Sequence, residues 1–350
     1  MREFKVVIPV VSAPRVTESP PPEWLSATQI AELISKIQAK STELRQNGGF
    51  VLSVSARDRY GAVERARDLT DRWDARSELS TGRRIVRANT AWVEGFKEPI
   101  PLMPLGRQVD IGAISRQNKT YDSSSPNEIS VRIDDAFQLA QPMEAGPRSA
   151  AISGGWASIE SLLTEGNEVE SLASPRLASI ITCSFPRAEL TTLASAHEEA
   201  TTDVLAEALK EAQSNLQRAR IMANALSRGD LVVGRGPHDD AACDRMSELL
   251  SDPKQTLQRV RDYVTICLNR LYRQRNLMLH GGRVAGAGRL EALATAPTLV
   301  GAGLDRIAHA WFAEMTPPVE LAARAELNLE LVGSPAGRHP TELLEPSQYS

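Results

Sequence analysis

The chain has 350 residues, of which 42% are hydrophobic and 24% are charged, and its formal net charge is −4. At roughly 150 residues per domain, this length predicts about two domains with enough apolar residues for a core in each. The balanced charge excludes a largely disordered chain and a uniformly basic nucleic-acid-binding surface. Any site for a polyanion must therefore be local.

The cysteine pattern and the apolar runs indicate a cytoplasmic protein without a membrane partner. Cys183, Cys243 and Cys267 are widely spaced and form no CxxC pair, which is typical of a reducing compartment. No apolar run approaches the ~20 residues of a membrane-spanning helix. The first residues contain Glu3 and reach Pro9 too early for a signal peptide.

Residues 1–110 alternate between strand-like and helix-like patterns. The elements that we expect are a strand at 3–12, a helix at 27–45, a strand at 50–56, a helix at 59–78 and a strand at 83–93. Ser26 and Gln29 have the spacing of a capping box, which places the start of the first helix. The alternation predicts a small N-terminal α+β domain, which suits a recognition or oligomerisation module.

The rest of the chain has a helical pattern. A polar stretch rich in turn-forming residues predicts a linker over 111–135, followed by an all-α bundle over 136–335 and a polar tail over 336–350. One apolar stripe runs from Ile152 to Leu163, and a longer one, from Val204 to Ala223, is expected to form one helix. Residues 229–241 are expected to form an exposed insertion. The fold class is therefore α+β, with a helical C-terminal part.

The helix expected over 254–280 carries an unusual arginine. Its apolar residues step around the helix by three and four, and the next position of this buried stripe after Leu271 is Arg275. A guanidinium there costs several kcal/mol unless it is paired or lines a wet cleft, since it stays charged. Gly281 and Gly282 end the helix at His280. An arginine and a histidine thus converge on one helix terminus.

The same segment is strongly basic. Residues 254–289 contain eight arginines and lysines against one acid, so this window has a charge of +7 while the rest of the chain has −11. Such polarity is typical of a surface that binds a phosphate backbone. We assign RNA binding to Arg270, Arg273 and Arg283.

Two motifs resemble the HEPN superfamily. The string from Tyr272 to Gly282 contains an arginine, a polar residue, three apolar residues and a histidine before Gly-Gly, as in the Apea-like branch of that superfamily. The run Gly155–Leu163, which contains Glu160, is similar to the first-helix motif of this branch. The resemblance extends over about 145–315, the C-terminal half.

The resemblance implies a metal-independent endoribonuclease without a cofactor. It implies a homodimer in which two Arg–His pairs form one composite site, with Arg275 as the transition-state cation and His280 as the general acid/base. By analogy, the N-terminal domain senses an invader or a partner protein, as in anti-phage defence or toxin–antitoxin pairs. The product of such a reaction is a 2′,3′-cyclic phosphate.

The chemistry agrees with these two residue types. Cleavage of RNA without a metal needs a group that moves protons and a cation that stabilises the phosphorane, and imidazole and guanidinium suit these roles. Residues five apart on an ideal helix differ by ~140° in direction. Arg275 and His280 therefore need a distorted last turn or a second subunit to address one groove.

The supporting residues each have two interpretations. Asn276 either holds the motif by hydrogen bonding to the backbone or to His280, or it lies on the helix surface. Tyr272 either stacks on a base or covers the site, or it packs in the core. Glu160 pairs with an arginine such as Arg275, or faces solvent. Two further functions remain open: a non-catalytic HEPN-like module that binds RNA or protein, and a toxin silenced by a nucleotidyl-transferring antitoxin that modifies Tyr272.

Other histidines have weaker claims to chemistry. His238, Asp239 and Asp240 lack a second cluster with ligand spacing, so an exposed acidic turn is favoured over a metal site. His197 and His309 lie in helical segments and are expected to be structural.

Overall fold

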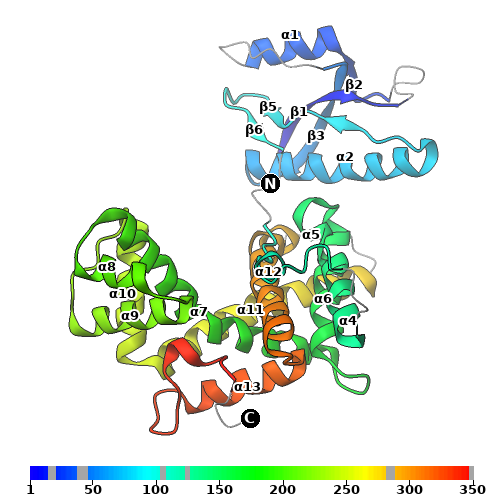
Figure 1. Ribbon diagram of the computed structural model, residues 1–350. Coiled ribbons are helices and arrows are strands. Elements are labelled where there is room, and N and C mark those ends of the chain that lie inside the picture. The colour runs from blue at the N-terminus through cyan, green and yellow to red at the C-terminus, as the bar shows by residue number, and fades with distance from the viewer. Residues whose placement is uncertain (15–20, 38–45, 103–107, 123–126, 281–287, 347–350) are drawn as a thin grey trace. The chain divides into compact units, whose positions relative to one another are not determined.

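The computed structural model describes all residues except 15–20, 38–45, 103–107, 123–126, 281–287 and 347–350. It divides the chain into two compact units, an N-terminal unit, Met1–Gly106, and a helical unit, Arg107–Ser350 (Figure 1). This division lies close to the expected domain end at residue 110. The expected α+β fold class with a helical C-terminal part is confirmed.

The N-terminal unit is an antiparallel sheet with two helices. Its elements are β1 (Arg2–Ser12), β2 (Trp24–Ser26), α1 (Ala27–Ile37), β3 (Gly48–Ala56), α2 (Arg59–Thr81), β4 (Val86–Arg87), β5 (Thr90–Val93) and β6 (Ile100–Pro101). The strand order is β2-β3-β1-β5-β6, with β4 paired to the end of β1. Strand β1 pairs with β3 from Arg2↔Ala56 to Val10↔Gly48, so these two strands form the centre of the sheet.

The central strand β1 is buried on both faces. Phe4, Val6 and Ile8 pack with α2, whereas Val7 packs with Ile30 of α1. Figure 1 shows α1 and α2 on opposite faces of the sheet. Because successive residues of a strand point to opposite faces, a strand between two helices becomes a continuous apolar run. This explains the run of valines and isoleucines in β1.

Most expected elements of this unit are present. Gln29 and Ser26 form the capping box: the Ser26 backbone N–H donates to Gln29 Oε1 at 3.0 Å and the Gln29 N–H to Ser26 Oγ at 3.4 Å. The second part of the helix expected over 27–45 lies outside the described residues. The single strand expected over 83–93 is wrong, because it is divided into two. β4 pairs with Val10 and Ser12 of β1, with a register shift between these two pairs, and β5 pairs with Val6 and Val7.

The helical unit packs helices that are far apart in sequence against one another. Its elements are α3 (Ala113–Arg116), α4 (Glu128–Ala140), α5 (Pro142–Ala145), α6 (Arg148–Leu163), η1 (Glu170–Leu172), α7 (Ala173–Ala200), α8 (Val204–Glu211), α9 (Asn215–Arg228), α10 (Pro237–Ser251), α11 (Pro253–Leu279), α12 (Gly288–Glu314), α13 (Pro318–Leu331) and η2 (Pro340–Glu342). Helices α6, α7, α11 and α12 contact one another. The apolar stripe of α6, from Ile152 to Leu163, is buried as expected.

Three expectations for this unit are wrong. The linker expected over 111–135 contains α3 and the start of α4, and the backbone N–H of Ala113 donates to Asp305 of α12 at 2.7 Å. The stripe expected as one helix over 204–223 is split between α8 and α9, because Ser214 caps a new helix by accepting from the Gln217 N–H at 3.2 Å. The expected insertion includes the first turn of α10.

The expected polar tail also packs on the helical unit. Leu343 and Leu344 are buried, and the Arg187 guanidinium binds the Thr341 carbonyl oxygen at 2.9 Å and the Glu345 carboxylate. The two leucines supply apolar area that the composition of 336–350 as a whole conceals. Among the described residues, no helix has the length and apolarity that a membrane span requires.

We expect Asp74→Ala to destabilise the N-terminal unit by about 1–3 kcal/mol. The buried Asp74 carboxylate accepts from the Ile85 N–H at 2.7 Å and from Arg84 Nη2 at 2.7 Å, so its loss leaves a backbone donor unpaired. Hydrogen exchange of β1 and β3 amides measures this free energy separately from the helical unit. Glu78→Ala is the control, since this exposed carboxylate lies 3.7 Å from the same Arg84; equal losses in both variants would contradict the assignment.

Candidate functional site

Helix α11 positions the Arg–His motif at its C-terminal end. The Asp252 carboxylate caps the helix start by accepting from the Gln255 N–H at 3.1 Å, and Pro253 occupies the first turn. Apolar residues of the expected stripe, among them Leu268 and Leu271, are buried, and the helix packs against α6, α7 and α12. The motif therefore begins from a rigid, well-packed helix.

Arg275 lies on the side of α11 that faces α6 and η1. Its Nη1 is 3.0 Å from Glu170 Oε2, and its Nη2 is 3.8 Å from Glu160 Oε2. Nη1 also donates to Asn276 Oδ1 at 3.0 Å. The side chain is only 18% exposed. The burial of this charge is thus offset by two carboxylates from other segments of the chain.

Glu160 pairs with Arg275 rather than facing solvent. Burial raises the pKa of the Glu160 carboxyl, the nearby Glu170 carboxylate raises it further, and the Arg275 guanidinium acts in the opposite direction. Desolvation and repulsion between the two acids therefore outweigh the attraction of the arginine. The three side chains form a cluster in which a single cation serves two carboxylates.

Tyr272 and Asn276 support the motif through packing. The Tyr272 ring lies against the Trp156 ring of α6, with a centroid distance of 4.5 Å and an interplanar angle of 40°. This half-buried position agrees with the core interpretation of Tyr272. The Asn276 side chain contacts Arg275, and the backbone N–H of His280 donates to the Asn276 carbonyl oxygen at 2.9 Å. Asn276 therefore joins the two motif residues by side chain and backbone.

His280 lies at the end of α11 with an exposed side chain. It is the C-cap residue, and its imidazole makes no hydrogen bond or ion pair with any described residue. No described contact joins it to the Arg275 side chain. The structure thus separates the two motif residues, as their ~140° difference in direction on a regular helix requires. Arg283, expected to bind RNA, lies outside the described residues.

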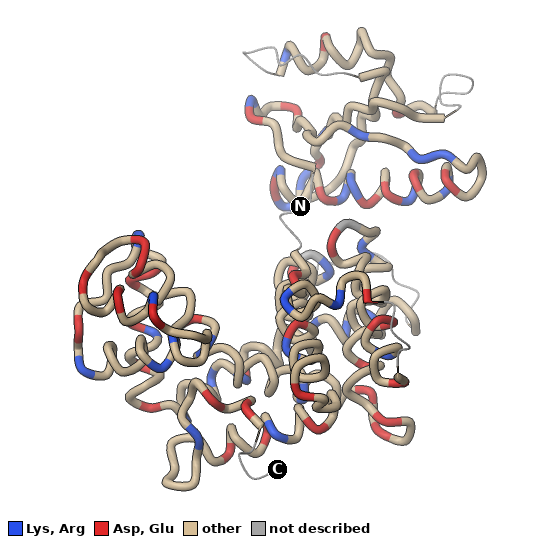
Figure 2. Tube along the Cα trace, viewed as in Figure 1, with Lys and Arg blue, Asp and Glu red and all other residues tan. Residues whose placement is uncertain are grey.

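The basic window is only partly available for a polyanion. Arg259 pairs with Glu248, Lys254 donates to the Glu330 carbonyl oxygen at 3.1 Å, and Arg275 pairs as above. Arg270 and Arg273 are exposed and have no ion pair within the described chain. In the tube view, both signs of charge occur throughout the helical unit (Figure 2). Two free arginines and one free histidine therefore remain on one part of α11.

The outward face of α11 also exposes apolar side chains. Tyr263 is 69% exposed, Ile266 49% and Leu277 42%. With Arg270 and Arg273, they recur at intervals of three, four and seven residues, which places them on one side of a helix. Exposed apolar groups at helical spacing are typical of a face that contacts another macromolecule.

The remaining histidines have structural positions. The buried His197 Nδ1 accepts from the Val233 N–H at 3.0 Å, and its Nε2 lies 3.0 Å from Asp203 Oδ1, so this ring ties three segments together, as expected. His238 is exposed in the first turn of α10. Within the described ranges, no three His, Cys, Asp or Glu side chains are grouped to hold a metal ion.

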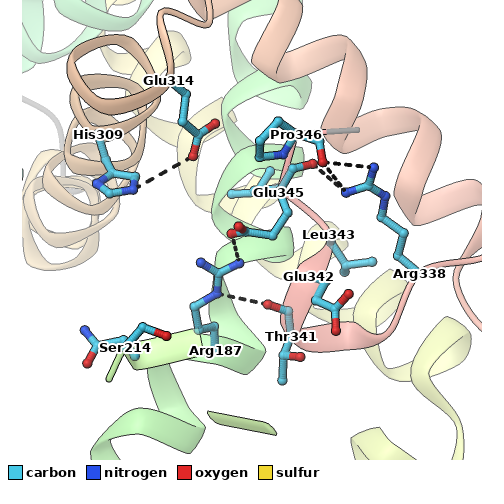
Figure 3. Close-up of polar contacts among 12 residues, drawn as sticks. Arg187, Ser214, His309, Glu314, Arg338, Thr341, Glu342, Leu343, Glu345 and Pro346 are labelled. Atoms are coloured by element: carbon cyan, nitrogen blue, oxygen red, sulfur yellow. Dashed lines mark hydrogen bonds and ion pairs between the residues drawn. The ribbon is translucent and has the colours of Figure 1, made fainter. Parts of the chain in front are cut away.

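A second polar region of the helical unit was not identified from the sequence. A pocket of about 610 Å³ lies between α7, α12 and residues 108–116, and includes neither Arg275 nor His280. Figure 3 shows Arg187 between Thr341 and Glu345 at this side of the unit, with His309 beside Glu314. The signal for this pocket was the group Asp305, Arg306 and His309 within the otherwise apolar run of α12.

Comparisons with protein-family models, with curated proteins and with solved structures find no match to this chain. The resemblance to the HEPN superfamily stays a prediction based on the two motifs.

We expect Glu160→Gln to stabilise the protein at pH 7 and to have little effect near pH 4. Because the folded-state pKa of Glu160 is raised, the native state binds this proton more tightly than the unfolded state, and stability falls as the pH rises through the raised pKa. The amide stays neutral and avoids this loss. Thermal unfolding at both pH values measures the difference.

Glu170→Gln is the matched control for this prediction. Glu170 is half-exposed and makes the shorter contact with Arg275, so its removal lowers stability by up to about 1 kcal/mol at pH 7. A Glu160→Gln variant that is also less stable at pH 7 would show that the ion pair with Arg275 outweighs the burial of Glu160.

Proposed function

We propose that the helical unit is a metal-independent endoribonuclease of HEPN type that acts at the C-terminal end of α11. The observation that carries this proposal is the uncommitted, exposed imidazole of His280 on a helix that also presents Arg270 and Arg273 to solvent. Arg275, held by Glu160 and Glu170, lies little more than one turn earlier. A proton-transfer group and three cations are thus concentrated at one end of α11.

The reaction needs only these groups. The ribose 2′-oxygen attacks the adjacent phosphorus while its proton passes to an imidazole, the bond from phosphorus to the 5′-oxygen breaks, and the leaving oxygen takes a proton. The products are a 2′,3′-cyclic phosphate and a 5′-hydroxyl. His280 is the general acid/base, and Arg275 is the cation for the phosphorane. Arg270, Arg273 and Arg283 hold the flanking RNA through its phosphates.

The active form in this proposal is a homodimer. His280 and Arg275 make no contact within one chain, so a second copy supplies the partner groups of a composite site. The exposed face of α11, with Tyr263, Ile266 and Leu277, is available for such an interface. The free cysteines Cys183, Cys243 and Cys267 agree with a cytoplasmic location. In this scheme, the N-terminal unit receives the signal of an invader, an antitoxin or a sensor protein.

A non-catalytic RNA- or protein-binding module is the second candidate. The observation that favours it is the engagement of Arg275 by two carboxylates, which gives this arginine a structural role without any substrate. In that case α11 binds through its exposed arginines and apolar side chains, and His280 has no chemical task.

We expect His280→Ala to lower the rate of RNA cleavage by about 100-fold or more, because it removes the proton-transfer group. Purified protein is incubated with labelled RNA in EDTA, and the formation of 2′,3′-cyclic ends is followed. His238→Ala is the matched control, since His238 is also exposed at a helix end and its side chain makes no hydrogen bond or ion pair with a described residue. Binding without cleavage in the unsubstituted protein supports the binding module, and cleavage that EDTA abolishes overturns the metal-free mechanism.

We expect the double variant Arg270→Ala/Arg273→Ala to weaken RNA binding and to reduce its salt dependence. Each phosphate contact on a single strand contributes about 0.7 to the slope of log K against log salt, so two contacts change it by roughly 1 to 2. Arg72→Ala/Arg76→Ala, on exposed positions of α2, is the control. An unchanged slope in the α11 variant would show that these arginines do not contact the RNA backbone.

A further inference from the structure

The pocket between α7 and α12 is lined by an arginine, Arg306, that is only partly exposed and has no partner among the described residues. Two further arginines, Arg116 and Arg187, line the same pocket. Arg306 makes no hydrogen bond or ion pair with the described part of the chain, and its Nε is buried without a partner. A charge in this state indicates a missing counter-ion.

The surroundings of Arg306 keep its charge uncompensated. Burial lowers the pKa of the Arg306 guanidinium, and the neighbouring Arg187 lowers it further, while Asp305, Glu314 and Glu345 act in the opposite direction. The residue keeps some exposed area and is one of the residues that line the pocket. A ligand in the pocket can therefore contact it.

The acids near Arg306 are engaged by other cations. Asp305 receives two hydrogen bonds from Arg116, at 2.9 and 3.0 Å, and one from the Ala113 N–H. Glu345 is bound by Arg187, and Glu314 lies 3.5 Å from Arg324. Each of these carboxylates therefore already has a counter-ion. The fourth acid, Asp110, is exposed to solvent at the edge of the pocket.

The pocket has the size and the lining of a site for a small polar ligand. Its volume of about 610 Å³ falls within the usual range of small-molecule sites. Hydroxyl groups of Ser184, Thr191, Thr192 and Ser195 line one side, on α7. No phenylalanine, tyrosine or tryptophan lines it, so a nucleobase would find no ring to stack on.

We propose that this pocket binds the phosphate monoester of a small polyol, with Arg306 as the counter-ion of the phosphate. Arginine binds phosphate oxygens through two parallel N–H donors, and Arg116 and Arg187 add further guanidinium groups to the same lining. The hydroxyl groups of α7 face the polyol. This site shares no residue with the Arg275–His280 motif, so a test of one proposal does not decide the other.

Isothermal titration of the full-length protein with ribose 5-phosphate, inorganic phosphate, adenosine monophosphate and acetate tests the assignment. We expect one site per chain, with ribose 5-phosphate binding more tightly than inorganic phosphate. Arg306→Met weakens binding of both by about 10- to 100-fold, since it removes a charged hydrogen-bonding partner. Tighter binding of adenosine monophosphate than of ribose 5-phosphate would overturn the polyol assignment, and acetate that binds as tightly as phosphate would overturn the phosphate assignment.

Thermal unfolding without ligand separates a binding role from a structural one. Arg306→Met replaces an unpaired buried cation by an apolar side chain and raises the melting temperature. The control is Arg176→Met, also on a half-buried arginine; Arg176 is paired with Glu168 outside the pocket, so this variant lowers the melting temperature and keeps phosphate binding. A lower melting temperature for Arg306→Met, or unchanged phosphate affinity, would overturn the proposal.

Discussion

The need to neutralise buried guanidinium groups organises the helical unit. Arginine keeps its charge at any working pH, so a largely buried guanidinium favours a packing that brings an acid from another segment to it. Arg275 ties α11 to α6 and η1 through Glu160 and Glu170, and Arg187 ties α7 to the C-terminal segment through Glu345. The net contribution of these ion pairs to the free energy of folding is small. They matter more because any other packing of the helices would leave a charge unpaired.

The same constraint distinguishes the two candidate sites. In the motif, the guanidinium is satisfied by the protein itself, and a phosphate can reach Arg275 only by sharing or displacing a carboxylate. Glu170 is the partner to displace, because it is 47% exposed and lies on the short η1 segment, whereas Glu160 is 23% exposed and lies in the last turn of α6. In the pocket, Arg306 has no such competitor. The proposed catalysis at the motif would therefore depend on an exchange of partners, and the proposed binding in the pocket would not.

The sequence predicted those features that depend on local spacing. The spacing of apolar residues by three and four predicted helix α11 and its buried stripe, and Gly-Gly predicted its end at His280. The capping box at Ser26 predicted the start of α1. Features that depend on distant partners were not predictable in this way. Strand β4 exists because it meets the end of β1, and the tail is ordered because Leu343 and Leu344 reach a core formed earlier in the chain. The pair of Arg275 with Glu160 was one of the two interpretations that the sequence left open for Glu160, and nothing in the spacing identified Glu170.

The geometry of α11 limits how one motif can act on one phosphate. Residues five apart differ by ~7.5 Å along the axis and by ~140° around it, so a regular helix directs Arg275 inward and His280 outward. In the proposed homodimer, a two-fold axis near the end of α11 would remove this difficulty, because the second copy would bring its own Arg275 and His280 to the same opening. Arg273 and Arg270, about two and about three turns before His280, would then extend the cationic surface on both sides of the shared opening, as an RNA strand crossing the two subunits would require.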